Sequence, residues 1–329
     1  MTEINVLNVY LISSVVNLLL VCGTPLVGTT VDLSYLGDRI YKTPDPATGD
    51  KVDNWNATSD INPEELGEYA EGDIVFTKSK LRNGLTSESS RWPNGEIPYQ
   101  IDGYFDADSL SKIRRAMDMY HKYTCITFRK REPHDTDYIS IVNSKSGCWS
   151  SVGRVGGEQK VNLQSPSCIT RIGTVVHELM HAAGFLHEQN RAERDDYVSI
   201  AWQNIKQGHE NNFEKATASS TSGFGVAYDY NSVMHYSSTA FSVNGKPTII
   251  PKDPSKDQKM GQRSGFSRGD LLKINAMYNC PEKTPELPQK PEVPDISDNS
   301  LNSNNNNNNN NGPLLGAAQG FLSWLFQKK

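Results

Sequence analysis

The stretch VVHELMHAAGFLHEQ, Val175–Gln189, carries three histidines whose spacing decides how the chain must fold around them. His177 and His181 lie four residues apart, so on a helix both imidazoles project from nearly the same face. Two such nitrogens can share one zinc ion at about 2.1 Å each. A continuous helix would carry His187 about 15 Å beyond His177 and onto another face. Gly184 can adopt the left-handed conformation that ends a helix, so we expect the chain to turn there and bring His187 to the same ion.

The residue after the first histidine supplies a proton acceptor. Three neutral imidazoles leave a zinc ion with a positive charge and an open position for water, whose pKa falls towards about 7. Glu178 can accept the proton of that water as it attacks a carbonyl, and then pass it to the leaving amine. The pattern H-E-x-x-H-x-x-G-x-x-H therefore predicts one catalytic zinc ion per chain and the hydrolysis of peptide bonds. The alternatives are a helix with two surface histidines and a structural zinc site; Glu178 and the open position argue against the structural site.

The composition favours one sizeable core with polar segments attached to it. The 329 residues carry a net charge of −5 and contain no basic block, which argues against a nucleic-acid ligand. No stretch is long and apolar enough to be a convincing membrane span. The hydrophobic content is low, at 36%, which predicts polar, poorly structured segments outside the core.

Residues 1–23 resemble a secretory signal peptide, with an apolar run from about Val6 to Val21. The start carries Glu3 and no Lys or Arg, so a buried N-terminal helix remains an alternative. Removing this segment leaves an even set of cysteines, which would pair in a secreted chain in one of three ways: Cys125, Cys148, Cys168 and Cys280. Asn56, in Asn-Ala-Thr, is a candidate glycosylation site. We therefore expect a secreted, extracellular glycoprotein.

Changes in composition divide the rest of the chain. Residues 24–82 are polar and rich in turn-forming residues, which indicates a pro-segment or spacer and not a core. Residues 83–281 make a domain of ordinary size. Residues 282–312 join a Pro-rich linker to a run of asparagines that has no apolar side chain to bury. Residues 313–329 are apolar but too short to span a bilayer; they favour contact with a partner or a membrane surface, or form a tail of no particular function.

The order of elements in residues 83–281 predicts an α+β fold. Residues 107–123 place apolar side chains at helical spacing, and Asp106 or Asp108 could cap that helix. The segments CITFRK, DYISIVNS and QKVNL read as strands. Strands thus precede the histidine helix, and loops with a late helix, SRGDLLKINAMY, follow it.

The extended histidine motif is typical of metzincins, and its continuation HEQNRAERDDYV, with YNSVMHY downstream, resembles the astacin family of zinc endopeptidases. The resemblance covers Asn83 to about Cys280 and the pro-segment, but not the tail. It implies a zincin-like catalytic domain of two lobes. The first would hold a twisted, mostly parallel sheet with an antiparallel edge strand and the active-site helix; the second would be irregular. Protein or peptide substrates and one zinc ion are also implied.

The resemblance assigns roles to three further residues near the motif. Met234 matches the Met-turn that packs beneath the metal site in the family. Tyr236 matches a tyrosine that ligates zinc in the resting enzyme and then stabilises the oxyanion, which a phenol can do as weak ligand and as donor. Glu188 matches the glutamate that meets the buried new N-terminus after activation.

The resemblance also implies how the protein is kept inactive. The junction aligns best with a cut between Arg82 and Asn83, made by a trypsin-like activating protease. Upstream, YAEGDIVF resembles the motif whose aspartate, here Asp73, replaces the zinc-bound water in the zymogen. Without the resemblance, an ordinary Gly-Asp turn would be the simpler interpretation of this segment.

Disulfides and substrate contacts follow from the same resemblance. The family's pairing gives Cys125–Cys280 and Cys148–Cys168. The segment CWSSVGR, which contains Trp149, resembles the edge strand along which substrate binds antiparallel.

Specificity is assigned to two arginines. Arg263 matches a position that reaches the S1′ pocket in relatives preferring an acidic residue after the cut, and Arg171 could assist it. The alternative is that both arginines are simply solvated.

Two functions from other classes compete with the protease. A secreted binding protein could keep this scaffold without cleaving, although a silent relative would be expected to lack one of the motif's residues, all of which are present. The function could also lie in residues 313–329, with the protease domain as a carrier.

Overall fold

The computed structural model describes residues 33–76, 90–217 and 221–281. The predicted signal peptide, the predicted cleavage junction Arg82–Asn83 and residues 282–329 lie outside these ranges. No helix within them combines the length and apolar character needed to cross a bilayer.

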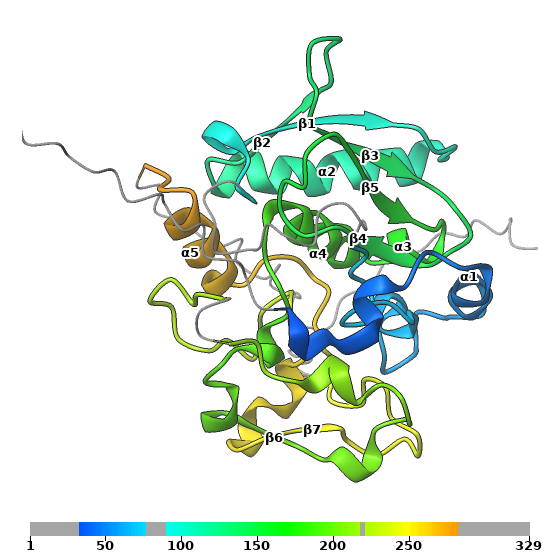
Figure 1. Ribbon diagram of the computed structural model, residues 1–329, viewed down its shortest axis with the longest axis vertical. Coiled ribbons are helices and arrows are strands. Elements are labelled where there is room, and N and C mark those ends of the chain that lie inside the picture. The colour runs from blue at the N-terminus through cyan, green and yellow to red at the C-terminus, as the bar shows by residue number, and fades with distance from the viewer. Residues whose placement is uncertain (1–32, 77–89, 218–220, 282–329) are drawn as a thin grey trace, which may run out of the picture. The chain divides into compact units, whose positions relative to one another are not determined.

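One five-stranded sheet organises the upper part of the described chain (Figure 1). Its strand order is β2-β1-β3-β5-β4. The first four strands in this order are parallel to their neighbours, whereas β4 pairs antiparallel with β5 at the edge. The strands are β1 (Glu96–Ile101), β2 (Thr127–Lys130), β3 (Tyr138–Val142), β4 (Cys148–Ser150) and β5 (Glu158–Leu163). The predicted mostly parallel sheet with an antiparallel edge strand is confirmed.

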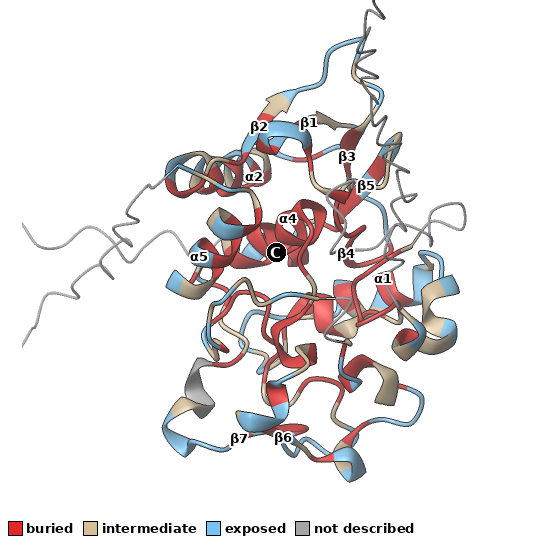
Figure 2. Ribbon diagram, turned by 60° about the vertical axis from the view of Figure 1, so that its left-hand side comes forward, coloured by how far each residue is buried: buried red, intermediate tan, exposed pale blue. Residues whose placement is uncertain are grey.

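Two helices pack together against this sheet (Figure 1). Helix α2 (Ala107–Tyr123) begins at Asp106, whose carboxylate accepts a hydrogen bond from the Ser109 N–H at 2.7 Å, so Asp106 is the cap. Helix α4 (Ile172–Ala183) carries the first two histidines. The Tyr120 hydroxyl donates to the Val176 carbonyl at 2.8 Å and joins α2 to α4. Figure 2 shows α4 as a buried ribbon, which explains why its sequence is apolar on nearly every side.

The second lobe is irregular, as predicted. Its only named strands in the described ranges are β6 (Val198–Ile200) and β7 (Ile249–Pro251), which pair antiparallel. Most of its backbone runs through loops and 3₁₀ turns around a separate set of buried aromatic residues. Helix α5 (Arg268–Met277) then returns to the first lobe, where Ile274 and Met277 join the main core.

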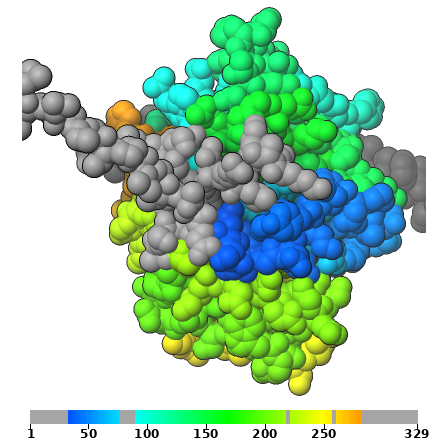
Figure 3. Space-filling model, in the orientation of Figure 1, coloured from blue at the N-terminus to red at the C-terminus, as the bar shows by residue number. Residues whose placement is uncertain are grey.

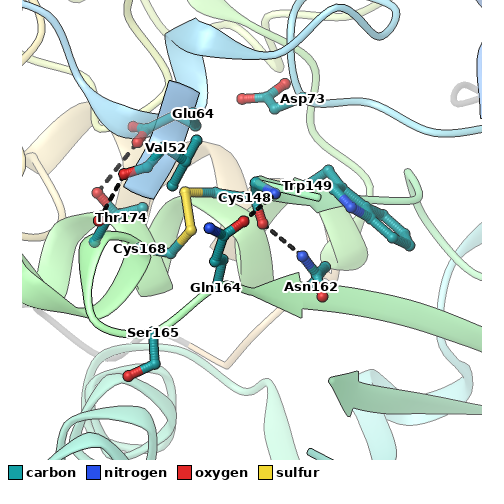
Figure 4. The surroundings of a disulfide bond; sticks show 12 residues. Val52, Glu64, Asp73, Cys148, Trp149, Asn162, Gln164, Ser165, Cys168 and Thr174 are labelled. Carbon is teal, nitrogen blue, oxygen red and sulfur yellow. Dashed lines mark hydrogen bonds between the residues drawn. A yellow bond between two sulfur atoms is a disulfide. The ribbon is translucent and has the colours of Figure 1, made fainter. Parts of the chain in front are cut away.

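Two disulfides hold these parts, with the same pairing that the family resemblance implied. Cys125–Cys280 ties the segment before β2 to the segment after α5. Cys148–Cys168 ties the edge strand β4 to the short helix α3 (Ser167–Thr170), as Figure 4 shows. The loop that precedes α4 is therefore fixed next to the edge strand.

Residues 33–76 lie across the molecule between the two lobes (Figure 3). They contain helix α1 (Pro46–Asp53) and several side chains that are almost fully buried: Leu36, Val52, Tyr69, Ala70 and Ile74. The polar composition of this segment did not indicate such burial. Its few apolar residues fit against the catalytic domain, so they leave no apolar pattern of their own.

Short 3₁₀ turns complete the described elements. They are η1 (Ser34–Tyr41), η2 (Pro63–Leu66), η4 (Pro93–Gly95), η5 (Glu188–Asn190), η6 (Arg194–Asp196), η7 (Trp202–Asn204), η8 (Glu210–Phe213) and η9 (Pro254–Lys259).

Candidate metal centre

Helix α4 stops where the sequence predicted that it would. Gly184 has φ 117° and ψ 17°, and its N–H donates to the His181 carbonyl at 2.8 Å. The Phe185 N–H donates to the Met180 carbonyl at 3.2 Å, which closes the helix end. The chain then turns back, and His187 lies with its ring centroid 4.7 Å from that of His181 and 5.1 Å from that of His177.

The three histidines converge on one point with their Nε2 atoms. The Nδ1 atoms of His177 and His181 lie 2.8 and 2.7 Å from the backbone carbonyls of Val233 and Phe185. A carbonyl only accepts, so each Nδ1 carries the hydrogen and each Nε2 presents a lone pair. These two Nε2 atoms lie 3.1 Å apart. Two facing lone pairs at this distance repel each other unless a cation lies between them, so the arrangement fits a metal ion.

Asp73, from residues 33–76, completes the group. Its carboxylate oxygens lie 2.9, 3.4 and 3.3 Å from the Nε2 atoms of His177, His181 and His187. One potential ligand atom from each of the four residues falls within 4.8 Å of all the others. Three imidazoles and one carboxylate are a ligand set that zinc accepts in tetrahedral geometry. All four residues are buried, so Asp73 closes this position from solvent in the described structure.

Electrostatics support a cation at the same point. Burial and the Arg263 charge lower the pKa of His177 to about 4, which keeps that ring in the neutral form that ligates. Burial also acts to lower the pKa of His187, but the carboxylates of Asp73 and Glu71 raise it to about 9. A positive charge is therefore favoured at this point, and a bound zinc ion would supply it.

Glu178, the predicted base, is not one of the four possible metal ligands. Its side chain is fully buried, and neither carboxylate oxygen has a hydrogen-bond partner among the described residues. Burial, and then the charges of Asp73 and Glu64, raise the pKa of this carboxyl well above its ordinary value. Such an unpartnered buried carboxylate is suited to a water molecule and to taking a proton from it.

Tyr236 lies next to the group of possible metal ligands, and its hydroxyl points to residues 33–76. Its ring centroid is 4.6 Å from that of His187, and its hydroxyl donates to the backbone carbonyl of Glu71. The Glu71 side chain in turn accepts from His187 Nδ1 and from the Tyr35 hydroxyl, each at 2.7 Å. Tyr236 is thus hydrogen-bonded to residue 71 here, and its zinc ligation in the resting enzyme stays a prediction.

Met234 and Glu188 lie in one buried layer beneath the histidines. Met234 is 1% exposed, and its carbonyl accepts the Glu188 N–H at 3.0 Å. The Glu188 carboxylate already has partners: Lys273 Nζ, Arg191 Nη1 at 2.8 Å and the Asp229 N–H at 2.9 Å. Burial raises the pKa of Glu188, but these cations outweigh it and lower the pKa. Glu188 is thus paired with two cations, beside a cavity of about 50 Å³.

The predicted substrate-binding residues are all covered by residues 33–76. Arg263 is buried and pairs with Glu64, so it is not a solvated arginine. Arg171 donates from Nη1 to Asn62 Oδ1 at 2.9 Å and from Nη2 to the Ala57 carbonyl. Trp149, on β4, is 4% exposed and packs edge-on against a tyrosine of the same segment.

The candidate glycosylation site Asn56 lies in an exposed turn. Its side-chain oxygen accepts the Thr58 N–H at 3.0 Å. A sugar would therefore meet no packed neighbour at this position.

The segment around Asp73 runs along β4 as an added strand. The Ser150 N–H donates to the Asp73 carbonyl at 2.9 Å, and the Val75 N–H donates to the Ser150 carbonyl at 3.0 Å. The bridge between Ile74 and Ser150 is parallel. A substrate that pairs antiparallel with β4 would run in the opposite direction.

Sequence reasoning missed two groups of supporting residues. The first comprises Glu64, Glu65 and Glu71. The signal that could have found them is the crowding of glutamates in PEELGEYAEGD, a segment expected to lie near a cation. The second lies on α5, where Asp270 accepts the Val233 N–H at 2.9 Å. The Val233 carbonyl then accepts from His177, so Asp270 holds the partner that orients this ligand. No periodicity in the sequence marks that role.

Fold and site together define a zinc endopeptidase domain of the metzincin type. The family model for astacin, which describes a family of peptidases, matches residues 84–279, and the chain belongs to the astacin family. Zinc as the cofactor is thereby confirmed, as is the predicted class of enzyme.

Several relatives share this domain. Zinc metalloproteinase nas-13 of Caenorhabditis elegans is 48% identical over 203 residues, which are 62% of this chain and 44% of that protein. Meprin A subunit beta of Homo sapiens is 44% identical over 223 residues, or 67% of this chain and 31% of that protein. The chain therefore spans less than half the length of these two relatives. The solved structure of high choriolytic enzyme 1, a hatching enzyme zinc-protease from Oryzias latipes, matches with a TM-score of 0.55 at 40% identity, covering 59% of this chain and 97% of that one.

Proposed function

We propose that this chain is a secreted zinc endopeptidase that is made as a zymogen and cleaves proteins after its pro-segment is removed. The observation that carries the proposal is the convergence of the three histidine Nε2 atoms on one point, together with the buried, unpartnered carboxylate of Glu178. A binding protein would have no use for a buried base at that position. Secretion is supported by the signal-like residues 1–23 and by the two disulfides.

In this mechanism His177, His181 and His187 would hold the zinc ion, which supplies a polarised water with a pKa near 7. Glu178 takes the proton of that water as the scissile carbonyl is attacked, and delivers it to the leaving amine. Tyr236, once released from the Glu71 carbonyl, can donate its hydroxyl to the developing oxyanion.

Latency follows from Asp73. Its carboxylate occupies the position that water needs, and the surrounding backbone fills the β4 edge that a substrate would use. Cleavage between Arg82 and Asn83 by a trypsin-like protease would free this segment. The new ammonium of Asn83 would then join Glu188, whose cavity of about 50 Å³ has room for it beside the existing cations.

A preference for an acidic residue at P1′ is supported by Glu64. Its carboxylate accepts from Arg263 Nε and from the Thr174 hydroxyl at 3.3 Å, the latter contact being visible in Figure 4. Burial alone would raise the pKa of Glu64, yet Arg263 and His177 lower it, so the pocket holds an anion. A substrate carboxylate could take this place when the pro-segment leaves. Arg171, held by the 57–62 turn, would be freed at the same time.

The test is a casein assay on trypsin-treated protein, with and without a zinc chelator. The Glu178→Ala variant should keep stoichiometric zinc and lose hydrolysis, because it removes the base and no ligand. The His181→Ala variant should lose both. Near-normal cleavage by the Glu178 variant, or activity that survives chelation, would refute the proposed mechanism.

The C-terminal residues 313–329 lie outside the described ranges, and contact with a partner or membrane surface stays a prediction. Deleting residues 281–329 should leave casein cleavage unchanged and alter only where the protein is found. Loss of cleavage in this deletion would instead place function in the tail.

A further inference from the structure

The direction of the pro-segment tells which side of the cut its acidic residues cover. Around Asp73 it runs parallel to β4, whereas a substrate would run antiparallel. Residues 74 and 75, which pair with β4, therefore stand where a substrate's residues before the cut would lie. Residues that precede Asp73 cover the opposite, primed side. Glu64 and Glu65 belong to this primed side, which agrees with the contact between Glu64 and Arg263.

Glu65, like Glu64, is bound by the catalytic domain, but through a different residue. One carboxylate oxygen accepts the Ser237 N–H at 2.7 Å, and the other accepts the Ser237 hydroxyl at 2.6 Å. The Glu65 side chain is 3% exposed. Its remaining contacts come from the backbone and side chain of Asn62, within the same turn. Ser237 thus forms a carboxylate-binding site with two hydrogen-bond donors.

The carboxylate-binding sites at Arg263 and at Ser237 are adjacent. Arg263 Nη1 donates to the carbonyl of His235, two residues before Ser237, at 3.2 Å, and the carboxylates bound by Arg263 and Ser237 belong to consecutive residues. Arg263 Nη2 is buried and has no hydrogen-bond partner among the described residues, so the guanidinium has a donor to spare. When residues 33–76 leave, these donors lose both carboxylates at once. Acidic side chains of a substrate can then replace these carboxylates with charge-assisted hydrogen bonds to the same donors.

We propose that the primed side of the cleft holds two neighbouring carboxylates, one on Arg263 and one on the N–H and hydroxyl of Ser237. The favoured substrates are then acidic peptides with one Asp or Glu at P1′ and a second at P2′ or P3′. This inference rests on the proposed function and adds Ser237 as a specificity-determining residue.

The test compares fluorogenic peptides cut by the trypsin-activated protein. Glu is kept at P1′, and P2′ or P3′ is changed from Gln to Glu, which alters charge and little else. At one of these positions we expect kcat/KM to rise about tenfold, the effect of hydrogen bonds to a charged group. In Ser237→Ala the N–H remains and the hydroxyl is lost, so the gain should fall to about threefold. Ser237→Thr should restore it.

Ser238→Ala is the matched control, because Ser238 is the next residue in the chain and belongs to the same irregular lobe. It should keep the full gain. The inference is overturned if neither position shows a gain, or if Ser237→Ala slows the Gln and Glu peptides equally. A separate pair of peptides, with Gln or Glu at P1′ only, tests Arg263. Equal kcat/KM values for this pair would overturn both the P1′ preference and the inference about Ser237. A higher kcat/KM for Glu at P1′, with no further rise for Glu at P2′ or P3′, would overturn only the inference about Ser237.

Discussion

Replacing the glycine that ends α4 should damage the metal site without touching a ligand. Gly184 has φ 117°, so the Gly184→Ala variant must hold an L side chain in a disfavoured region, at a cost of about 1–2 kcal/mol. Its Cβ would lie 2.7 Å from the Met277 methyl group, whose flexible side chain can move for less than about 1 kcal/mol. We expect a loss of about 2–3 kcal/mol in the free energy of unfolding. Any shift of the chain here also displaces His187, and zinc tolerates only about 0.2 Å in its ligand distances.

The assay has two readouts on the full chain. Urea unfolding with and without a chelator gives the free energy, and competition with a chromophoric chelator gives the zinc affinity, which should fall at least about tenfold. Gly245→Ala is the control, because Gly245 has φ 73° and a Cβ there would meet nothing within 4 Å. It should lose about 1–2 kcal/mol and bind zinc normally. If Gly184→Ala binds zinc as tightly as Gly245→Ala, the turn at Gly184 does not position His187.

Three further outcomes follow from the structure. Removing Cys125–Cys280, which closes a separation of 155 residues, should lower the free energy of unfolding by about 5 kcal/mol in chain-entropy terms, as urea titration of the double Ala variant would show; a loss below about 1 kcal/mol contradicts this. The hydrogen bond from His209 lowers the pKa of the Glu68 carboxyl far below its ordinary value of 4.5. The charged carboxylate therefore stabilises the fold above pH 4.5, and this contribution is lost as the pH falls below 4.5. Between pH 6 and 3 the free energy of unfolding of the wild type should fall by about 1 kcal/mol more than that of Glu68→Gln, and equal falls would contradict the pairing. Asp270→Asn should weaken zinc binding about tenfold in the competition assay, and unchanged affinity would show that the Val233 backbone holds its place unaided.

The metal site could be predicted from sequence because its geometry is local. His177, His181 and Gly184 lie within one helix and its stop, and helical geometry alone fixes how they relate. The placement of His187 needed only the turn at the glycine. The sheet was also accessible, since parallel strands before a buried helix leave apolar runs in the sequence.

The contacts that residues 33–76 make with the catalytic domain could not be predicted from the sequence. Glu65 and Ser237 are 172 residues apart, and nothing local in either segment indicates the other. Leu36 and Ile74 are each 1% exposed, yet neither belongs to a long apolar run or to a periodic apolar pattern. Their partners belong to the surface of another folded unit, so burial arises without helical or strand periodicity. The Glu188–Lys273 pair escaped for the same reason, because it joins two elements that the fold alone brings together.

The covalent link between Cys125 and Cys280 gives the catalytic domain the topology of a ring. All three metal-binding histidines, Glu178 and Tyr236 lie inside it. A single break in the backbone anywhere between the two cysteines would open the ring and release no piece of it. A first cut by another protease, or by a second copy of the enzyme, would therefore leave every part of the site covalently joined. Only a second cut inside the ring could release a fragment of it.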